Sequence, residues 1–376
     1  MDSALDLITE RIRAAAAVGT PLRIRGGGSK DFYGQSLQGE VLDTRPLSGI
    51  TSYEPTELVV TVQAGTPLAE LEAVLAERGQ CLPFEPPHFR AGPHPEPLGE
   101  ELHSSGPAAG SVATVGGMVG AGLSGPARAS VGSLRDYVLG VTMLNGRGEL
   151  LTFGGQVMKN VAGYDVSRLM AGSLGTLGVM VEMSLKVMPA APAESTLVLE
   201  LDEARALSQL NRWAGLPLPI NASCWHEGAL MLRLRGAQAA VAAAEKTMGG
   251  QRMEPATAQQ LWAAVREQTV PFFALQGEEV LWRLSVADTA AALGLGSTLI
   301  EWGGAQRWIK GSVADEPRVR AAALAAGGHA TLFRGGDKSV GVFTPLAPAL
   351  HNIHQALKKQ FDPAGIFNRG RQFADY

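Results

Sequence analysis

Three consecutive glycines, Gly26 to Gly28, stand between an arginine and a serine–lysine pair in the sequence RGGGSK of residues 25–30. Glycine has no Cβ, so consecutive glycines can adopt positive φ and let several backbone N–H groups converge on one anion. The same six letters are compatible with a phosphate cradle, a flexible linker or an ordinary turn. Only the surrounding chain can separate these three interpretations.

The chain around this loop alternates strand and helix patterns. Residues 1–19 predict an amphipathic helix, and PLRIR predicts a short strand that runs into the glycines. The β-rich run ELVVTVQAG, residues 57–65, precedes a predicted helix with Thr66 as its N-cap, Pro67 at N1 and Gly79 at its end. A strand is expected next, over residues 81–84. This order indicates an α/β arrangement.

Residues 85–110 interrupt that order with six prolines, four glycines and three histidines. Proline and glycine at this density leave little room for a helix or a central strand, so we expect a long surface loop. His88, His94 and His103 have irregular spacing, which favours ordinary loop residues over a metal site.

After the loop, residues 114–133 form a second glycine-dense segment, TVGGMVGAGLSGPARASVGS. Two strands joined by a turn at Asn145-Gly146 follow, and then a short helix at residues 167–171. Pro189 and Pro192 mark an expected domain boundary. Beyond it, strands such as residues 229–236 and 280–286 alternate with alanine-rich helices, which predicts a separate α+β domain.

Length and composition set wider limits. A chain of 376 residues exceeds one ordinary core and predicts two domains. The net charge of −4 contains no long block of either sign, so nucleic-acid binding is not expected. The two cysteines, Cys81 and Cys224, form neither a disulfide framework nor a CxxC site and fit a reducing cytoplasm. The sequence has neither a signal-peptide pattern nor a long apolar run, so no membrane span is expected.

Two familiar nucleotide motifs are matched only in part. GAGLSG, residues 120–125, has the glycine spacing of the dinucleotide fingerprint, but Pro126 interrupts an immediate helix and only Glu149 stands near the expected acidic position. In GGGSK the serine precedes the lysine, which is not the order of a Walker A motif. The second glycine segment could instead hold its backbone against a flat ring or a second phosphate.

The order of these segments resembles the FAD-binding, PCMH-type domain of the vanillyl-alcohol oxidase family. The resemblance is carried by GGGS, EPTELVVTVQAGTPLAELEAVLAERG, CLPFEPP, TVGGMVGAGLSGP and GSLGTLGV, and more loosely by FDPAGIFN near the C-terminus. Residues 116–140 and 154–179 are similar to the GlcE type of bacterial glycolate oxidase subunit. The resemblance implies an α+β fold: a two-subdomain FAD-binding domain over residues 1–190, then a smaller FAD-linked oxidase-like cap domain over residues 191–376.

The resemblance also implies a set of cofactor-binding residues. The glycine loop would hold the FAD pyrophosphate, the second segment would line the pyrophosphate and isoalloxazine, and the last members would meet the adenine side or the flavin. These residues are Gly26, Gly27, Gly28, Ser29 and Lys30; Pro83, Thr114, Gly116, Gly117 and Met118; and Gly178, Val179 and Asn368. Ordinary strand packing is the alternative for Thr114 and Val179. Arg369 replaces the proline that commonly follows the asparagine in this family.

Several departures from the family pattern limit what the resemblance implies. Leu174 stands where catalytic relatives commonly have glutamate. The glycine loops contain no His, Cys or Tyr that could attach the flavin covalently, so non-covalent FAD is expected. The chain lacks a GHxGDGNxH motif and has only His329 in the corresponding region, which leaves its catalytic residues unknown. Candidate carboxylate-binding residues are Arg233, Arg235, Arg283, Arg307 and Arg334, with surface or interface ion pairs as the alternative. Trp225, Trp282, Trp302 and Trp308 favour a core or interface role.

The expected function is that of an FAD-binding subunit of a glycolate oxidase complex, which oxidises glycolate to glyoxylate in glyoxylate metabolism. The resemblance implies a catalytic FAD subunit and an iron–sulfur subunit as partners, with the chain in the cytoplasm, or at the inner face of the membrane through those partners. One alternative is a self-sufficient FAD-dependent dehydrogenase for a small 2-hydroxy acid. A second is a structural scaffold that carries no flavin.

Overall fold

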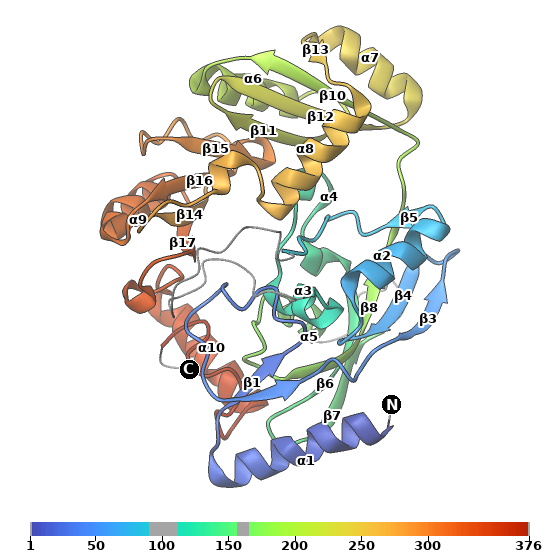
Figure 1. Cartoon of the computed structure of the whole chain (residues 1–376), viewed down its shortest axis with the longest axis vertical. Helices are drawn as coiled ribbons and strands as arrows, with labels where there is room; N and C mark the ends of the chain where they lie inside the picture. The colour runs from blue at the N-terminus through green and yellow to red at the C-terminus, as the bar shows by residue number, and fades with distance from the viewer. Residues whose placement is uncertain (1, 90–111, 156–164, 375–376) are drawn as a thin grey trace.

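The computed structural model describes residues 2–89, 112–155 and 165–374, and these residues form two sheet-based halves (Figure 1). The lower half in Figure 1 contains most of the N-terminal half of the chain and the C-terminal tail, and the upper half contains the segment between them. This arrangement confirms the expected α+β fold. The predicted histidines His94 and His103 lie outside the described residues.

The lower half is built on an antiparallel five-stranded sheet in the order β3-β4-β8-β6-β7. Its strands are β3 (Ile50–Glu54), β4 (Val59–Gln63), β8 (Val179–Lys186), β6 (Val138–Leu144) and β7 (Leu150–Gly154). The smaller elements around it are α1 (Asp2–Val18), β1 (Leu22–Arg25), β2 (Glu40–Asp43), α2 (Leu68–Glu77), β5 (Gln80–Cys81), α3 (Val115–Ala121), α4 (Arg128–Val131), the 3₁₀ turn Leu134–Tyr137, α5 (Val166–Leu169) and β9 (Met188–Pro189). Strands β1 and β2 are parallel, and β5 pairs with β9.

The upper half is an eight-stranded sheet in the order β13-β10-β12-β11-β15-β16-β14-β17. Its strands are β10 (Ala193–Glu200), β11 (Ile220–His226), β12 (Ala229–Gly236), β13 (Gln251–Arg252), β14 (Val280–Ser285), β15 (Thr298–Glu301), β16 (Gln306–Gly311) and β17 (His329–Arg334). Its helices are α6 (Glu203–Ala214), α7 (Gln238–Met248), α8 (Pro255–Glu267) and α9 (Glu316–Ala325), with 3₁₀ turns at Pro271–Phe273, Trp302–Gly304, Val313–Asp315 and Lys338–Val340. Helix α10 (Pro348–Phe361) returns the chain to the lower half.

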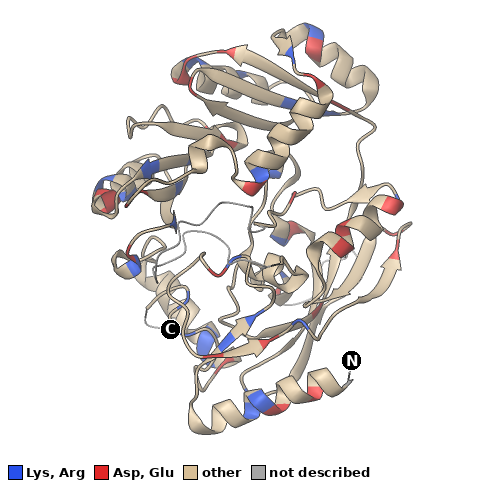
Figure 2. Ribbon diagram, viewed as in Figure 1, with Lys and Arg blue, Asp and Glu red and all other residues tan. Residues whose placement is uncertain are grey.

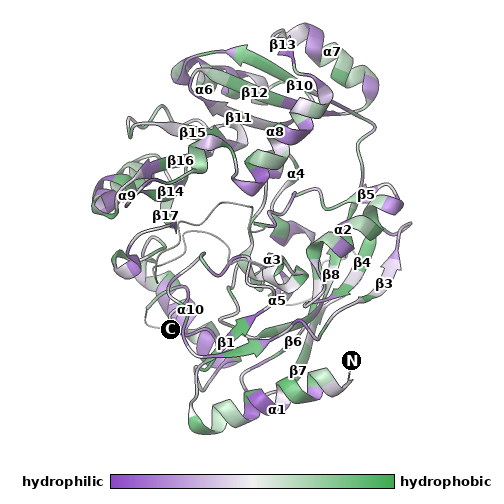
Figure 3. Ribbon diagram, in the orientation of Figure 1, coloured by the Kyte–Doolittle hydropathy of each residue, from purple (hydrophilic) through white to green (hydrophobic). Residues whose placement is uncertain are grey.

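Apolar residues concentrate on the strands that lie inside each half, as the green colour of β6, β8 and β12 in Figure 3 shows. All five residues of β4 are buried, and Val60 and Val62 share an apolar cluster with residues of α2 and α3. One apolar cluster joins the two halves, with Phe32 and Phe89 from the lower one and Trp308 and Phe333 from the upper one. The expected core or interface role of the four predicted tryptophans is therefore confirmed.

Polar contacts also cross between the halves. The carboxylate of Glu85 accepts hydrogen bonds from Arg233 at 2.7 Å, and the indole Nε1 of Trp302 donates to the carbonyl of Gly125 at 3.0 Å. Lys338 donates to the carbonyl of Phe32 at 2.8 Å. Because charged residues of both signs are scattered over both halves (Figure 2), these specific contacts, and not a broad charge pattern, position one half against the other.

The structure corrects two sequence-based predictions and agrees with a third. Helix α2 begins at Leu68 with Pro67 as N-cap, because the Thr66 hydroxyl accepts a hydrogen bond from the N–H of Gly49 instead. GAGLSG overlaps the end of a helix, where Gly122 has φ +64°, which agrees with the expectation that this segment is not a dinucleotide fingerprint. Residues 86–89 of the expected surface loop are buried between the two halves.

The hairpin of β6 and β7 confirms the turn expected at Asn145-Gly146. The side chain of Asn145 stabilises it, because Oδ1 accepts from the N–H groups of Arg147 and Glu149 at 2.9 and 3.0 Å. The positive φ falls on Gly148, so the turn is longer than a two-residue connection.

Candidate functional site

A cleft in the lower half collects most of the residues predicted to bind a cofactor. Its empty space, open to solvent, is about 760 Å³, which lies within the range of ligand sites in proteins. The predicted residues that line it are Gly26, Gly27, Gly28, Ser29, Lys30, Thr114, Gly116, Gly117, Gly178 and Asn368. They come from the end of β1, the start of α3, the start of β8 and the C-terminal tail, which are far apart in the sequence.

The three glycines of the loop have two different physical reasons to be glycine. Gly28 has φ +79°, a conformation that disfavours side chains. Gly26 and Gly27 lie against the segment that enters α3: a Cβ on Gly26 would be 2.2 Å from Thr114 Oγ1, and a Cβ on Gly27 would be 1.6 Å from the carbonyl oxygen of Val112. The loop can thus reach this position only without side chains at these residues.

The loop presents backbone donors that have no partner among the described residues. The N–H groups of Gly26, Gly27 and Gly28 donate to no backbone or side-chain oxygen of the described residues, whereas the carbonyl of Gly27 accepts from the N–H of Val112 at 3.3 Å. Unsatisfied backbone N–H groups that point into a cleft attract an anion.

The charges around the cleft agree with an anionic ligand. Arg25, Lys30 and Arg371 line it, and Asp31 is the carboxylate among the described lining residues. The Asp31 carboxylate accepts from Arg25 Nε at 2.7 Å. Burial lowers the pKa of Lys30 to about 8, partly opposed by the negative charge of Glu267. A bound anion would offset the cost of burying these cations.

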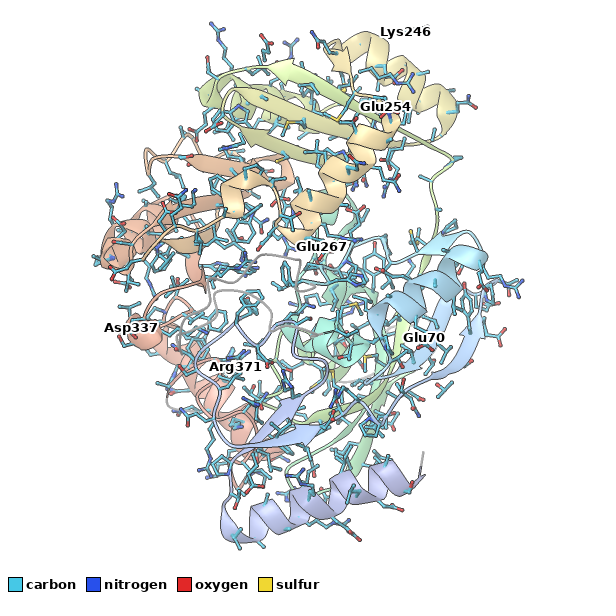
Figure 4. The ribbon with its side chains drawn as sticks, viewed as in Figure 1. Glu70, Lys246, Glu254, Glu267, Asp337 and Arg371 are labelled. Atoms are coloured by element: carbon cyan, nitrogen blue, oxygen red, sulfur yellow. The ribbon has the colours of Figure 1, made fainter. Side chains whose placement is uncertain are left out.

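Arg371 is a cleft residue that the sequence analysis missed. Figure 4 shows it in the lower half, and its guanidinium donates to the carbonyls of Asp31 at 2.8 Å and of Tyr33 and Gln35 at shorter range. Burial lowers the pKa of Arg371 to about 10. Because it holds the turn that follows the glycine loop, the C-terminal tail contributes to the shape of the cleft. The sequence offered one indication that Arg371 lies near the cofactor site, because it follows the predicted Asn368 by three residues in FNRGR.

Asn368 connects three segments at the base of the cleft. Its Oδ1 accepts from the N–H of Ile24 at 2.8 Å, and its Nδ2 donates to the carbonyl of Leu174 at 2.6 Å. Leu174 itself has φ +52°, and a Cβ on Gly175 would lie 2.7 Å from Asn368 Nδ2. The asparagine therefore positions β1 and the turn before β8 in addition to lining the cleft.

Helix α3 begins directly at the cleft, although its glycine-rich sequence did not predict a helix. Thr114 is the N-cap, and its Oγ1 accepts from the N–H of Gly117 at 3.2 Å. A Cβ on Gly116 would be 2.8 Å from the Cβ of Ala64. The backbone of this segment therefore approaches the residue that follows β4, whereas the sequence analysis expected it to approach a ligand. The first N–H groups of α3 are used within the protein: those of Val115 and Gly116 donate to the carbonyls of Thr66 and Ala64 at 3.0 and 2.7 Å. The anion site therefore rests on the glycine loop.

Three predicted residues do not line the cleft. Met118 is 1% exposed and packs in the core under the five-stranded sheet, and Val179 is completely buried in the cluster beside α1. Pro83 is buried between Leu82 and Phe84. Their burial favours a packing role over direct contact with a ligand in the cleft.

The candidate arginines of the upper half separate into two groups. Arg233 and Arg235 pair with Glu85, and the fully buried Arg307 donates to the carbonyls of Gly304 and Ala290. These three arginines therefore serve in ion pairs or internal hydrogen bonds, which was the alternative to binding a substrate carboxylate. Arg283 and Arg334 have no carboxylate within 4 Å among the described residues.

No group of three or more His, Cys, Asp or Glu side chains that could hold a metal occurs among the described residues. His88 instead contacts Glu72, with Nε2 2.8 Å from the carboxylate. Its backbone N–H donates to Glu267, a residue that Figure 4 shows at the lower end of α8.

Taken together, the cleft fits a nucleotide that carries a diphosphate. The glycine loop carries backbone N–H groups without a partner among the described residues, and its close packing excludes side chains. Three cations lie beside it, and residues of β1, α3, β8 and the tail line the same cleft. Hydrogen bonds to a charged partner contribute roughly 1.5 to 3 kcal/mol each, so several such donors can hold a diphosphate without a metal ion.

Comparisons with known proteins agree with this geometry. Residues 5–92 match the family model described as an FAD binding domain. The chain is 46% identical over 369 residues to "Glycolate oxidase subunit GlcE" of Escherichia coli (strain K12), a match that covers 98% of this chain and 97% of that protein. It is 28% identical to "Glycolate oxidase subunit GlcD" of Bacillus subtilis (strain 168), over 50% of this chain and 36% of that protein.

Among solved structures, an alkyldihydroxyacetonephosphate synthase is similar, with a TM-score of 0.62 over 96% of this chain and 74% of the other. The two sequences are 14% identical, so this likeness concerns the fold alone.

Proposed function

We propose the function of this chain from one premise: it belongs to the family of the glycolate oxidase subunit GlcE. Membership over nearly the full length, together with the FAD-binding domain, makes the chain an FAD-binding subunit of a glycolate oxidase and an FAD-dependent oxidoreductase that acts on hydroxy acids. The single observation that carries this conclusion is the 46% identity over 97% of the relative's length. The cleft supplies a physical place for the cofactor.

The proposed cofactor-binding residues are the predicted residues that line the cleft, with Arg25 and Arg371 added. The glycine loop would receive the diphosphate, the start of α3 would line the cleft beside it, and Arg25, Lys30 and Arg371 would balance its charge. When bound, FAD supplies a hydride acceptor. The chain's own residues hold the cofactor non-covalently, because no His, Cys or Tyr stands in the glycine loops.

The assembly around this subunit is the finer part of the proposal. The chain passes electrons onward within a complex that contains a catalytic FAD subunit and an iron–sulfur subunit. Support comes from the sequence, which lacks a GHxGDGNxH motif, and from the cleft, whose described lining contains no histidine. Within residues 2–89, 112–155 and 165–374, no helix is long and apolar enough to cross a bilayer. We place the complex in the cytoplasm, at the inner face of the membrane where a partner anchors it.

We also propose that the chain divides into its two domains near residue 190. Strand β9 ends at Pro189 and pairs within the lower half, and β10 begins at Ala193 in the eight-stranded sheet. Two prolines, Pro189 and Pro192, flank this change of sheet.

The function is tested by purifying the chain alone and recording its visible spectrum before and after anaerobic addition of glycolate. We expect a flavin spectrum that glycolate leaves unchanged until the partner subunits are added. Rapid bleaching of the lone chain would instead identify a self-sufficient dehydrogenase. A chain that takes up no flavin under any reconstitution condition would be a scaffold.

A second prediction concerns the pH dependence of FAD affinity. Lys30 has a pKa of about 8 in the cofactor-free chain because burial disfavours its charged form. A bound diphosphate favours the charged form, so above about pH 8 binding must be accompanied by proton uptake and becomes weaker. Affinity should fall by up to about tenfold per pH unit between about pH 8 and pH 9 and stay level below that window.

Lys30→Met should remove this pH dependence and weaken FAD binding at neutral pH. The matched control is Lys246→Met, an exposed lysine on α7 at the far end of the upper half in Figure 4. Equilibrium dialysis of FAD at several pH values measures both effects. An unchanged pH profile in Lys30→Met would remove Lys30 from the site.

A further inference from the structure

Helix α10, at the side of the lower half in Figure 1, carries a row of exposed residues: Leu350, Ile353, Ala356 and Lys359. They follow one another at every third position, so they form one ridge across the solvent side of the helix. Leu350 and Ile353 are neighbours in this row and are 51% and 54% exposed. The α10 ridge is therefore apolar over its first three residues and positive at its last.

The first ten residues of α10 are poorly covered by the rest of the protein. Between Pro348 and Leu357 none of the side chains is buried, and the buried residues of the helix are Lys358 and Phe361 at its end. Short helices are marginal in water by themselves and owe most of their stability in proteins to the packing of an apolar side. The apolar part of the ridge is thus a place where packing against a partner would add stability.

A hollow lies at the positive end of the ridge. Its space, which is open to solvent, is about 1010 Å³. Helix α10 contributes Gln355, Lys358 and Lys359 to the lining, and the tail contributes residues 362–365, 369, 370 and 374. Lys359 is therefore both the last residue of the ridge and part of the wall of the hollow.

The unpaired charges of the hollow are positive. Neither Lys359 nor Arg369 has a carboxylate within 4 Å among the described residues, and Arg369 donates to backbone carbonyls. The carboxylate of Asp362, the one acidic group in the described lining, is 1% exposed and already pairs with Lys358 at 2.8 Å. This local positive charge, in a chain whose net charge is −4, favours contact with carboxylates of a partner.

The tail also separates the hollow from the cofactor cleft. Asn368 and Arg371 line the cleft, whereas Arg369 and Gly370, which stand between them in the sequence, line the hollow. Four consecutive residues therefore contribute to the walls of both spaces. A partner that enters the hollow contacts the same short segment that shapes the cleft.

We propose that the α10 ridge and the adjoining hollow dock a partner subunit, which presents an apolar segment flanked by carboxylates. The apolar segment covers Leu350 and Ile353, and a carboxylate enters the hollow and pairs with Lys359 and Arg369. An apolar centre with a charged rim is the usual composition of a protein interface. A membrane surface fits less well, because the ridge exposes two large apolar side chains and not a broad apolar face. The chemistry of the surface follows from these residues; that its occupant is a subunit of the oxidase complex rests on the proposed function.

The test measures binding of the FAD-loaded chain to the purified catalytic FAD subunit and iron–sulfur subunit by biolayer interferometry. Ile353→Gln should weaken binding by about tenfold, and the double variant Leu350→Gln/Ile353→Gln by about 100-fold, because polar side chains replace the apolar ones that the partner buries. Leu324→Gln is the matched control, since Leu324 is 74% exposed on α9 and lies off the ridge, and it should leave the affinity unchanged. All three variants should retain FAD like the wild type.

A charge reversal tests the hollow. Lys359→Glu should weaken binding by about tenfold at low salt and remove most of its salt dependence, because it reverses a charge that meets the partner's carboxylate. Lys246→Glu, on α7 in the upper half, is the control and should change neither property. Amide hydrogen exchange locates the contact: binding of the partner should slow exchange over residues 351–357 by about tenfold or more in the wild type.

The outcomes separate this inference from the proposed function. Equal affinities in the wild type, the double variant and Lys359→Glu would overturn the inference and leave the function intact, because the complex still forms. A wild-type chain that binds neither subunit contradicts the proposed assembly and the inference with it. Self-association of the lone chain that the double variant loses would assign the ridge to a second copy, and sedimentation with phosphatidylglycerol vesicles that this variant loses would assign it to a membrane. Either result would overturn the proposed occupant.

Discussion

Gly27→Val is expected to abolish retention of FAD. A Cβ at this position would be 1.6 Å from the carbonyl oxygen of Val112 and 2.6 Å from its carbonyl carbon, so the collision is with backbone that cannot rotate away. The glycine loop and the segment before α3 must separate, which moves the donors of the cradle apart. Overpacking of a tight site costs about 1 to 3 kcal/mol, and a backbone collision lies at the upper end, so affinity should fall by about 100-fold or more.

The measurement is FAD content after gel filtration, with a dialysis titration for the affinity. Gly215→Val is the matched control, because Gly215 is exposed, has negative φ and would place its Cβ 3.7 Å from the nearest heavy atom outside its neighbours. Urea unfolding of both variants without FAD shows whether the loop variant is folded. A folded Gly27→Val chain that retains FAD at the wild-type level would remove the loop from the site.

Lys358→Met is expected to destabilise the chain by about 3 to 5 kcal/mol. The three ammonium donors of Lys358 are all used, by the carboxylate of Asp362 at 2.8 Å and by the carbonyls of Thr176 and Phe367 at 2.8 and 2.7 Å. Asp362 is 1% exposed. Methionine fills a similar volume but leaves a buried carboxylate without its cation.

The same substitution should weaken FAD binding. The Lys358–Asp362 pair fixes the start of the tail that carries Asn368 and Arg371 to the cleft, and Asp362 also accepts from the N–H of Phe367 at 2.8 Å. The control is Lys359→Met, the adjacent exposed lysine on α10, which should change stability by no more than about 0.5 kcal/mol. Urea denaturation followed by tryptophan fluorescence measures the difference. Equal midpoints for the two variants would show that the pair does not hold the tail.

Features that depend on consecutive residues were predicted well from the sequence. The glycine loop lies at the end of β1 as expected, and the periodic leucines of α2 and the hairpin of β6 and β7 were found with errors of one or two residues. The N-terminus of α2 was misplaced because Thr66 bonds to Gly49, a residue 17 positions away. A local capping signal was thus replaced by a tertiary hydrogen bond.

Helix α3 and the buried segment around residue 88 were not predicted, for a common reason. Glycines disfavour a helix in isolation, but Gly116 allows α3 to approach Ala64 more closely than any other residue would. Prolines favour a surface loop, but the N–H groups of His88 and Phe89 are satisfied by Glu267, from a helix nearly 180 residues later. In both places a long-range contact outweighs the local preference.

The sequence by itself indicated the class of ligand, because the glycine segments and the residues between them resemble, in that order, a family of FAD-binding domains. Only the tertiary structure decided which charges meet at that ligand, which predicted residues face it, and which side of α10 stays exposed. Arg25 and Arg371 are 346 positions apart, and both line one cleft. Burial and ion pairing depend on distances through space, and those distances are set by the packing of the two sheets and the return of the tail.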